Sequence, residues 1–356
     1  MESWTDIWQR GQDARADPAM LKVFTQQDLG EPYEPKNDTP DWEKLFAVRK
    51  PWKRGVVPWP ASVLTGFIDV QGNRFEWGLW AWGEGFCGWL VDRGVIAHDY
   101  TQDQAWAALD ALTARRWPTA AGGEIDVLHW GIDTGAFTQA LYDRVGGRHS
   151  LLATKGDNRP SAIPLKKGRV DLRDHSGRKI AGRRLNLAFI GNFDLKLSIY
   201  EGLRSLVAGP EPGGAWRPGT LHLPDWAGED ELRQLTAEVL IDPREYEVGA
   251  SNKRRGALVK TGERREWRKK PHQPNEALDI VVGARALAWG EGAGQLTASE
   301  WRERAAKAHG ATGQQGALWQ APEPESQTPS EVEAIVAAPA VRKLSWREAM
   351  ERRANV

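Results

Sequence analysis

Three short segments early in this chain constrain its fold more than any other feature of the sequence. They span residues 63–70, 74–82 and 85–96, and the turn-forming residues 71–73 separate the first two. Segments of this length, rich in apolar residues and bounded by turn chemistry, predict β-strands joined as hairpins. We therefore expect the folded part of the chain to begin with three antiparallel strands.

Helices and strands are expected to alternate after these hairpins. Trp106, Leu109 and Leu112 recur at helical spacing, and Asn275 is a candidate helix cap. The patterns predict helices over residues 101–116, 137–145, 195–207, 229–240 and 275–289, and strands over residues 125–132, 150–154 and 165–190. Hairpins followed by such alternation indicate an α/β domain with a mixed β-sheet flanked by helices.

The composition suggests three regions along the chain. Residues 1–60 are rich in Pro, Asp, Glu and Trp, and we expect an N-terminal arm or linker there, with short helices at 5–12 and 18–27. Residues 61–295 form the expected domain. Residues 296–356 are expected to be a flexible tail ending in a short helix that opens with a capping box at Ser345. That helix is either a docking element or a frayed end.

Several classes of protein are excluded by simple counts. Cys87 is the single cysteine, which excludes an intrachain disulfide and a multi-cysteine zinc site. No apolar run reaches the roughly 18 residues that a membrane span requires, and the N-terminus lacks an apolar signal core. We therefore expect an intracellular protein with no membrane partner.

The net charge is zero, yet the charges are segregated along the chain. Residues 144–204 carry 14 Lys or Arg against 5 Asp or Glu, and residues 252–272 carry 9 against 2. Such segments could face DNA phosphates, or they could simply solvate exposed hairpins. The candidate DNA-binding residues here are Lys166, Lys167, Arg183, Arg184, Lys253, Arg254 and Arg255.

Three aspartates are placed where carboxylates could meet. Asp69 and Asp133 each end an apolar strand, and Asp279 lies on the last strong helix. Gly283 and Ala286 share a face with Asp279, so that face could pack tightly against a sheet. Buried carboxylates need a compensating positive charge, and their oxygens suit two Mg²⁺ or Mn²⁺ ions that clamp a phosphodiester. Taken singly, each aspartate is more often a turn or cap residue.

Five short motifs occur in an order that resembles the nuclease domain of lambda-like phage terminase large subunits. They lie at residues 64–71, 131–135, 155–156, 234–238 and 275–279. Upstream, residues 17–22 and 29–34 resemble the join between the motor and the nuclease of that family. Each motif is weak alone, but their order over roughly residues 5–290 makes the resemblance specific.

The resemblance implies an RNase H-like fold in which three acids hold two metal ions. By position these acids are Asp69, Asp133 and Asp279, with Glu276 and Glu238 as further candidate ligands. The alternative for Glu238 is a solvated acid on a helix.

Three other residues near the motifs are less specific. Lys155 and Lys196 could contact the scissile phosphate or the DNA backbone, or they could be plain surface lysines. His129 lies inside an apolar strand and is expected to be a core histidine rather than a ligand.

A complete member of the family carries an ATPase ahead of its nuclease. The sequence contains no G-x-x-x-x-G-K-[ST] phosphate loop, so we expect no ATP hydrolysis by this chain. The ATPase is then a separate chain or a domain missing from this one.

The resemblance and the acids together predict a metal-dependent endonuclease that cuts double-stranded DNA during viral genome packaging. As a phage or prophage protein it would act in the host cell cytoplasm. The family implies the terminase small subunit as a partner and makes the portal a candidate partner of the C-terminal helix. Two alternatives stay open, a junction-resolvase-like nuclease and a non-catalytic packaging protein that binds DNA or the procapsid.

Overall fold

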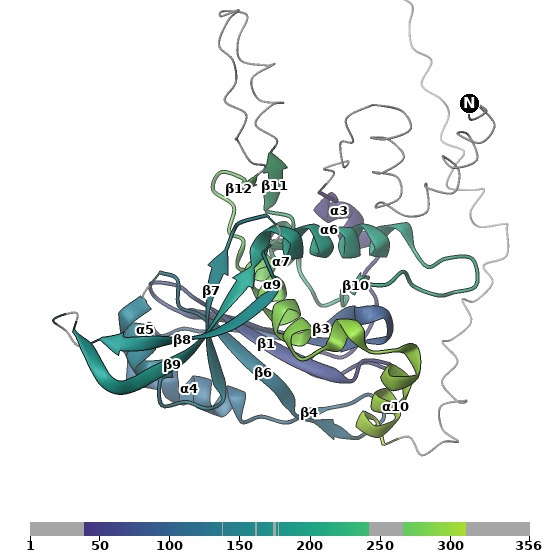
Figure 1. The fold of residues 1–356 in the computed structure, drawn as a ribbon. Helices are drawn as coiled ribbons and strands as arrows, with labels where there is room; N and C mark the ends of the chain where they lie inside the picture. Colours follow the sequence, from purple (N-terminus) through teal and green to yellow (C-terminus); the bar gives the residue numbers. More distant parts are fainter. Residues whose placement is uncertain are drawn as a thin grey trace, which may run out of the picture. The chain divides into compact units, whose positions relative to one another are not determined.

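The three predicted hairpin strands form an antiparallel meander (Figure 1). In the computed structural model they are β1 (Val63–Val70), β2 (Phe75–Gly83) and β3 (Cys87–Ile96), and a short 3-10 helix η2 (Glu84–Phe86) precedes β3. The prediction of these strands is confirmed. The structure describes residues 39–136, 138–160, 162–173, 176, 178–241 and 266–310.

These strands belong to an eight-stranded sheet with the order β10-β3-β2-β1-β6-β7-β9-β8. The other members are β6 (Val127–Asp133), β7 (Leu151–Asp157), β8 (Leu165–Arg173), β9 (Lys179–Gly191) and β10 (Leu221–His222). β6 runs parallel to β1, and β7 runs parallel to β6. A meander extended by parallel strands beside its first strand is an RNase H-like arrangement, as the resemblance implied. Two small sheets pair β4 (Trp117–Pro118) with β5 (Glu124–Ile125) and β11 (Glu238–Ile241) with β12 (Glu266–Lys269).

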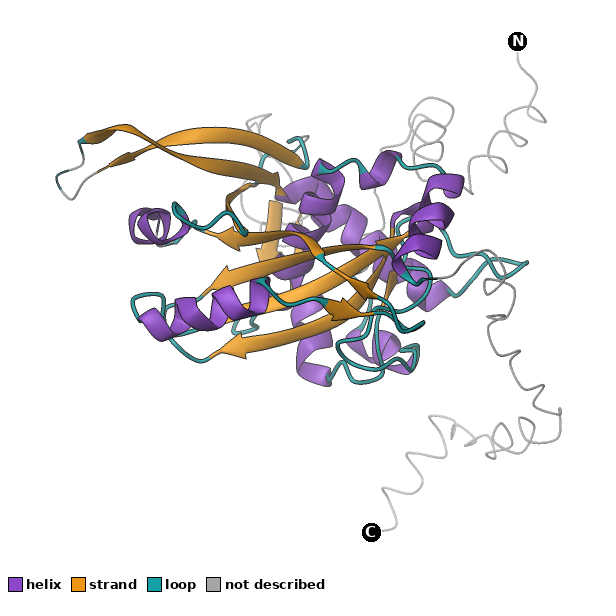
Figure 2. Ribbon diagram, turned by 90° about the horizontal axis from the view of Figure 1, so that it is seen from below, coloured by secondary structure: helices purple, strands orange, loops and turns teal. Residues whose placement is uncertain are grey.

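Helices lie on both faces of the large sheet (Figure 2). One face packs against α9 (Glu276–Gly290), with α3 (Trp42–Ala47), α6 (Asn192–Ala208) and α7 (Glu229–Leu235) beside it. The other face carries α4 (Asp103–Thr113) and α5 (Thr138–Val145). Each face has its own hydrophobic core. Among the described residues, no helix is both long and apolar enough to cross a bilayer.

Helix α9 fits closely onto the sheet because small residues line its contact face. A Cβ on Gly283 would stand 2.2 Å from the Phe67 ring of β1, so only glycine allows this approach. The Thr65 hydroxyl donates a hydrogen bond of 2.7 Å to the carbonyl of Ala284. These contacts show that α9 runs antiparallel to β1, which brings the first turn of α9 to the carboxyl end of β1.

The folded unit is longer than the predicted domain of residues 61–295. Leu45 and Val57, placed in the expected arm, are fully buried in the two cores. After a short 3-10 helix η3 (Ala293–Gln295), helix α10 (Ala298–Ala308) buries Trp301 in the region predicted to be tail. Both boundaries are corrected because large apolar side chains beyond them complete the core.

One helix prediction was wrong in its extent. Residues 229–240 were expected to be helical throughout, but α7 ends at Leu235 and Glu238 begins β11. Val239 and Ile241 are β-branched residues, which favour a strand. The helices predicted at 5–12 and 18–27, the C-terminal helix and the motor–nuclease join at 17–34 lie outside the described residues.

Candidate active site

Asp69 and Asp133 lie side by side at the carboxyl ends of β1 and β6. Ile68 and Ile132 are paired in parallel register, and the two aspartates are the next residue on each strand. Residues in register on neighbouring strands project to the same face. Phe67, two residues before Asp69, packs on Gly283, so both aspartates lie on the face covered by α9.

Asp279 reaches the same place from the first turn of α9. Its carboxylate raises the pKa of Asp69 and is itself affected by the charge of Asp133. The three acids, far apart in the sequence, therefore share one electrostatic environment. The predicted convergence of Asp69, Asp133 and Asp279 is consistent with the fold, because the strand register and the direction of α9 both lead to it.

The pKa of Asp69 shows how unfavourable a charged carboxylate is at this position. Burial, with only 8% of the residue exposed, is the largest cause that raises the pKa of Asp69 to about 7. The negative charges of Asp279, Asp133 and Glu276 raise it further, while a hydrogen bond of 2.6 Å from the Gln71 amide opposes them. A cation bound at this point would favour the charged carboxylate again.

Asp133 and Asp279 are perturbed in the same direction. Burial is the first cause of the raised pKa of each carboxyl group. The backbone N–H of Gly135 donates a hydrogen bond of 2.9 Å to Asp133, and this bond and the charge of Lys155 lower its pKa. The charge of Lys196 lowers that of Asp279. The protein therefore compensates the acids only in part.

Glu238 and Lys196 form a buried ion pair next to Asp279. The Lys196 ammonium lies 2.7 Å from the Glu238 carboxylate and 3.4 Å from that of Asp279. The Asn275 amide donates hydrogen bonds of 2.9 Å to Glu238 and 2.8 Å to Asp279. The Tyr200 hydroxyl donates to the backbone carbonyl of Glu238 and accepts from its N–H.

These contacts exclude two of the open alternatives and correct one prediction. Lys196 is a buried counter-charge for the acids rather than a surface lysine, and Glu238 is a buried acid on a strand rather than a solvated acid on a helix. Asn275 precedes α9, but its side chain makes no capping hydrogen bond and instead joins two carboxylates. Lys196 and Asn275 thus stabilise the carboxylates of Glu238 and Asp279 by ion pairs and hydrogen bonds.

Two further acids border the cluster. Glu76 of β2 lies directly opposite Asp69 and pairs with Arg74 at 2.7 Å and Arg93 at 3.4 Å. Glu276 lies one turn before Asp279, and its Oε2 is buried with no hydrogen-bond partner among the described residues. The sequence reasoning considered Glu276 but missed Glu76. A hairpin register would have placed Glu76 beside Asp69.

Carboxylates make this cluster suited to hard divalent cations. Within the described ranges, no group of three or more His, Cys, Asp or Glu side chains is arranged to hold a metal ion by itself. Mg²⁺ usually takes only one or two protein carboxylates and completes its octahedron with water and substrate phosphates. The partnerless Glu276 oxygen and the raised pKa of Asp69 fit a site of this open kind.

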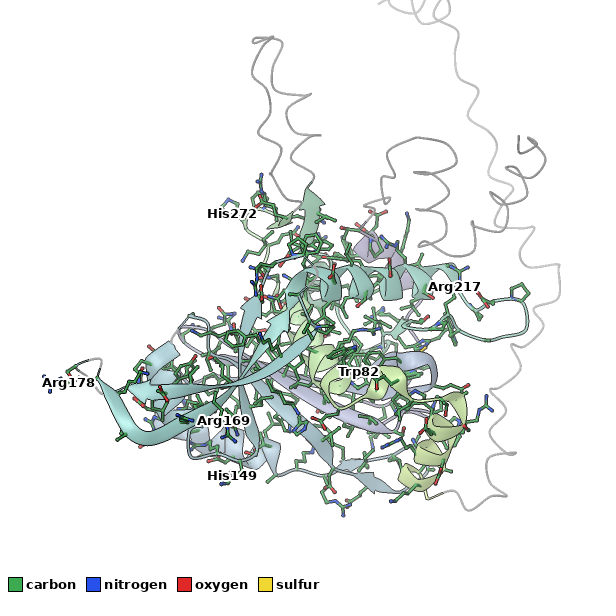
Figure 3. The ribbon with its side chains drawn as sticks, in the orientation of Figure 1. Trp82, His149, Arg169, Arg178, Arg217 and His272 are labelled. Atoms are coloured by element: carbon green, nitrogen blue, oxygen red, sulfur yellow. The ribbon has the colours of Figure 1, made fainter. Side chains whose placement is uncertain are left out.

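The predicted DNA-contacting residues are only partly together. Lys155 follows Thr154 and so lies on the other face of β7, where its ammonium is 5.6 Å from the Tyr142 ring, while its charge still lowers the pKa of Asp133. Lys166, Lys167 and Arg184 lie on the β8–β9 hairpin, whose loop holds Arg178 (Figure 3). The Arg183 side chain and residues Lys253, Arg254 and Arg255 lie outside what the structure describes.

His129 is not the core residue that the sequence suggested. It is half-exposed on β6, and its Nε2 lies 3.0 Å from the Glu291 carboxylate just after α9. Lys167 of β8 binds the same carboxylate at 2.7 Å. The apolar strand pattern concealed this because alternate residues of β6 face different environments.

The sequence of the chain is similar to those of one kind of phage protein. A family model described as the terminase large subunit gpA endonuclease domain matches residues 1–301. The chain is 28% identical over 299 residues to the terminase large subunit of Escherichia phage lambda, and 26% identical over 293 residues to that of Enterobacteria phage P21. Each match covers 80% of this chain and 41% of the relative, so the chain spans about two fifths of their length. No solved structure matched the chain.

Proposed function

The chain belongs to the family of terminase large subunit gpA endonuclease domains, and from this premise we propose that it cuts double-stranded DNA by metal-dependent hydrolysis. Asp69, Asp133 and Asp279 would hold two divalent ions, Mg²⁺ or Mn²⁺. The observation that carries the proposal is the position of the acids: Asp69 and Asp133 end neighbouring strands in register, and the charge of Asp279 reaches Asp69 and raises its pKa. A functional site commonly keeps groups in such a perturbed state.

The chain's own residues have distinct tasks in this proposal. The strand ends fix Asp69 and Asp133 in register, and α9 presents Asp279 against them. Lys196 and Asn275 restrain Asp279 and Glu238 by ion pairing and hydrogen bonds. When bound, two divalent ions would neutralise the acids, orient the phosphodiester and activate a water for attack. Glu276 and Glu238 are further candidate ligands.

Partners of this domain follow from the same family. Double-stranded DNA is the proposed substrate, held through backbone phosphates that carry little sequence information. Choice of a DNA sequence would then come from the terminase small subunit. An ATPase, in the same polypeptide or in a separate one, would drive packaging in the host cytoplasm. The portal is proposed as the partner of the C-terminal segment.

A cleavage assay on supercoiled plasmid tests the proposal directly. We expect nicking or linearisation with Mg²⁺ or Mn²⁺ and none with EDTA. Asp69→Asn should lower the rate at least about 100-fold, because metal ions supply several kcal/mol of transition-state stabilisation. Asp99→Asn, which changes an exposed loop aspartate, is the matched control.

Two results would contradict the proposal. Full cleavage by Asp69→Asn would rule out the proposed metal site. Cleavage that persists in EDTA would rule out the dependence on metal ions. DNA binding without cleavage under any metal would favour the non-catalytic packaging protein. Strong preference for branched DNA would favour the junction-resolvase alternative.

A further inference from the structure

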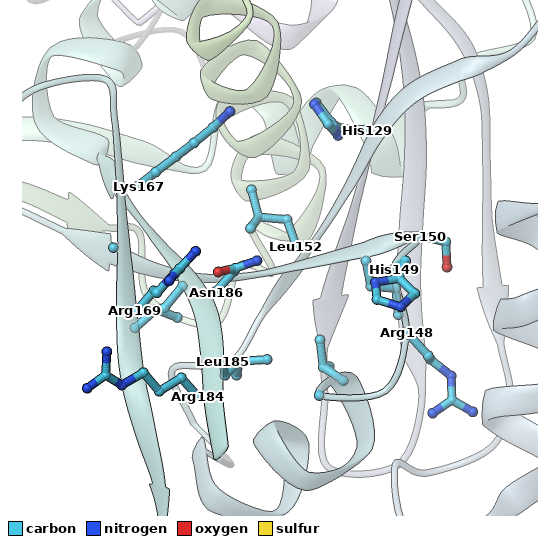
Figure 4. A pocket seen from close by; sticks show the side chains of 15 residues that line it. His129, Arg148, His149, Ser150, Leu152, Lys167, Arg169, Arg184, Leu185 and Asn186 are labelled. Atoms are coloured by element: carbon cyan, nitrogen blue, oxygen red, sulfur yellow. The ribbon is translucent and has the colours of Figure 1, made fainter. Parts of the chain in front are cut away.

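A cavity lies at the amino ends of β6 and β7, and Figure 4 shows the side chains that line it. It has a volume of about 630 Å³ and is lined by the amino-terminal halves of β6 and β7, the end of α5 and the β8–β9 hairpin. The acids instead occupy the carboxyl ends of β1 and β6. The cavity is therefore a separate feature of the same sheet.

The cavity exists because the sheet forks. β7 pairs with β9 from Ala153 and Leu187 onward. Toward the other end, Leu151 of β7 keeps its pairing with β6, while β9 continues with β8 through the pair Asn186 and Arg169. The two halves of the sheet thus separate at this level, and polar side chains occupy the mouth of the gap.

The lining of the cavity is positive. Four of its fifteen residues are Lys or Arg, two are His, and none is acidic. Lys167, Arg169 and Arg184 lie along the hairpin wall, with Arg148 and His149 across the opening (Figure 4). A pocket with this composition attracts anions.

Three of the four Lys and Arg side chains have acidic neighbours outside the cavity, and Arg169 is the exception among the described residues. Lys167 pairs with Glu291, and Arg184 pairs with Asp171. Within the described part of the chain, exposed Arg169 has neither an ion pair nor a hydrogen bond from its side chain. Surface pairs of this kind are worth at most about 1 kcal/mol, so an incoming phosphate can replace them. Arg169 supplies the uncompensated charge.

The cavity and the acids also share a face. Leu165, Lys167 and Arg169 occupy every second position of β8 and so share the α9 side of the sheet, where Leu165 approaches Gly290. His129 stands four residues before Asp133 on β6, a separation of about 13 Å along the strand. The major groove of DNA is about 12 Å wide. Phosphates of one duplex are separated by similar distances, so a duplex bound at the acids can also reach the cavity.

We propose that the cavity binds a phosphate of the duplex backbone away from the scissile bond, with Arg169 as its principal contact. The site would hold the duplex at the β8–β9 hairpin while the acids act on another phosphate. The proposal deepens the proposed function and rests on it in one respect, that duplex DNA is the substrate. Its ligand chemistry, a phosphate ester, is shared by free nucleotides, so the test must separate the two sources.

The test measures binding of a fluorescent duplex by anisotropy in EDTA, so that cleavage plays no part. Each phosphate contact adds about 0.9 to the slope of log affinity against log salt. Arg169→Gln should lower the magnitude of this slope by about one. Between roughly 50 and 200 mM salt, the variant should therefore lose about 3.5-fold less affinity than the wild type. Arg169→Lys should keep the slope. Arg302→Gln, an exposed arginine on α10, is the matched control and should keep it too.

A second arm measures thermal stabilisation by inorganic phosphate and by deoxyadenosine monophosphate. An unchanged slope in Arg169→Gln would overturn the proposal, as would nucleotide stabilisation that depends on Arg169 without any effect on duplex binding. The outcomes separate from those of the cleavage assay. Normal cleavage with an unchanged slope defeats this site alone, whereas a lowered slope without cleavage under any metal defeats only the nuclease.

Discussion

Replacing Asp69 by asparagine is expected to stabilise the metal-free protein at pH 8 and to leave its stability nearly unchanged at pH 4. The pKa of Asp69 is about 7 in the folded protein, against 3.8 for the unperturbed carboxyl group. Between these values the folded state binds a proton that the unfolded state releases. Stability from this group is therefore complete below pH 3.8 and is lost as the pH rises through 7.

The size of the effect follows from the shift in pKa. Each unit corresponds to 1.36 kcal/mol, so a rise from 3.8 to about 7 makes the charged form cost about 4 kcal/mol at pH 8. Asparagine removes that charge and can still accept the hydrogen bond from Gln71. For a domain of this size the gain corresponds to a rise in Tm of the order of 10 °C.

Thermal unfolding of both proteins at pH 4 and pH 8, in EDTA, measures the prediction. Asp99→Asn is the control, because hydrogen bonds from Thr101 lower the pKa of that exposed carboxyl group. Mn²⁺ at pH 8 should raise the Tm of the wild type more than that of Asp69→Asn, since a cation offsets the cost of the charge. An equal or lower Tm for Asp69→Asn at pH 8, or the same gain at both pH values, would refute the reasoning.

Two further substitutions test the packing and charge balance around the acids. Lys196→Met should lower the free energy of unfolding by about 3–5 kcal/mol at pH 8, because it leaves Glu238 buried without its partner, and Glu238→Gln in the same chain should restore much of it. Urea unfolding checks this, and equal losses with and without Glu238→Gln would contradict it. Gly283→Ala should cost about 1–3 kcal/mol, since its Cβ would meet the Phe67 ring, and Phe67→Leu should relieve part of that cost in the same assay. Additive losses would show that the two residues do not clash.

The sequence predicts those parts of the fold that local pattern determines. The hairpin strands, the alternating elements after them and the mixed sheet follow from apolar runs, turn residues and helical spacing. The strand-end positions of Asp69 and Asp133 follow in the same way, because both end an apolar segment. The close packing of α9 could also be predicted from the sequence, since Gly283 lies on the same helix face as Asp279.

The balance of charge around the acids could not be predicted in this way. Lys196 is 42 residues from Glu238 in the sequence, and Asn275 is 37 residues from it. Only the packing of α6 and α9 brings these residues together. Local pattern placed Glu238 on a helix and left Lys196 without a partner. Long-range pairing thus decides which acids stay charged, and local sequence patterns do not predict such pairs.

The chain has zero net charge, but the fold places acidic and basic side chains at two separate sites. Acids converge at the carboxyl ends of β1 and β6, where each raises the cost of charging Asp69. Cations line the fork at the amino end of β7, on the same face. A polyanion is repelled at the first place unless cations are bound there, and it is attracted at the second. Under the two proposals, the affinity for DNA would depend on the basic fork and cleavage would depend on the metals, so the two properties should respond to separate substitutions.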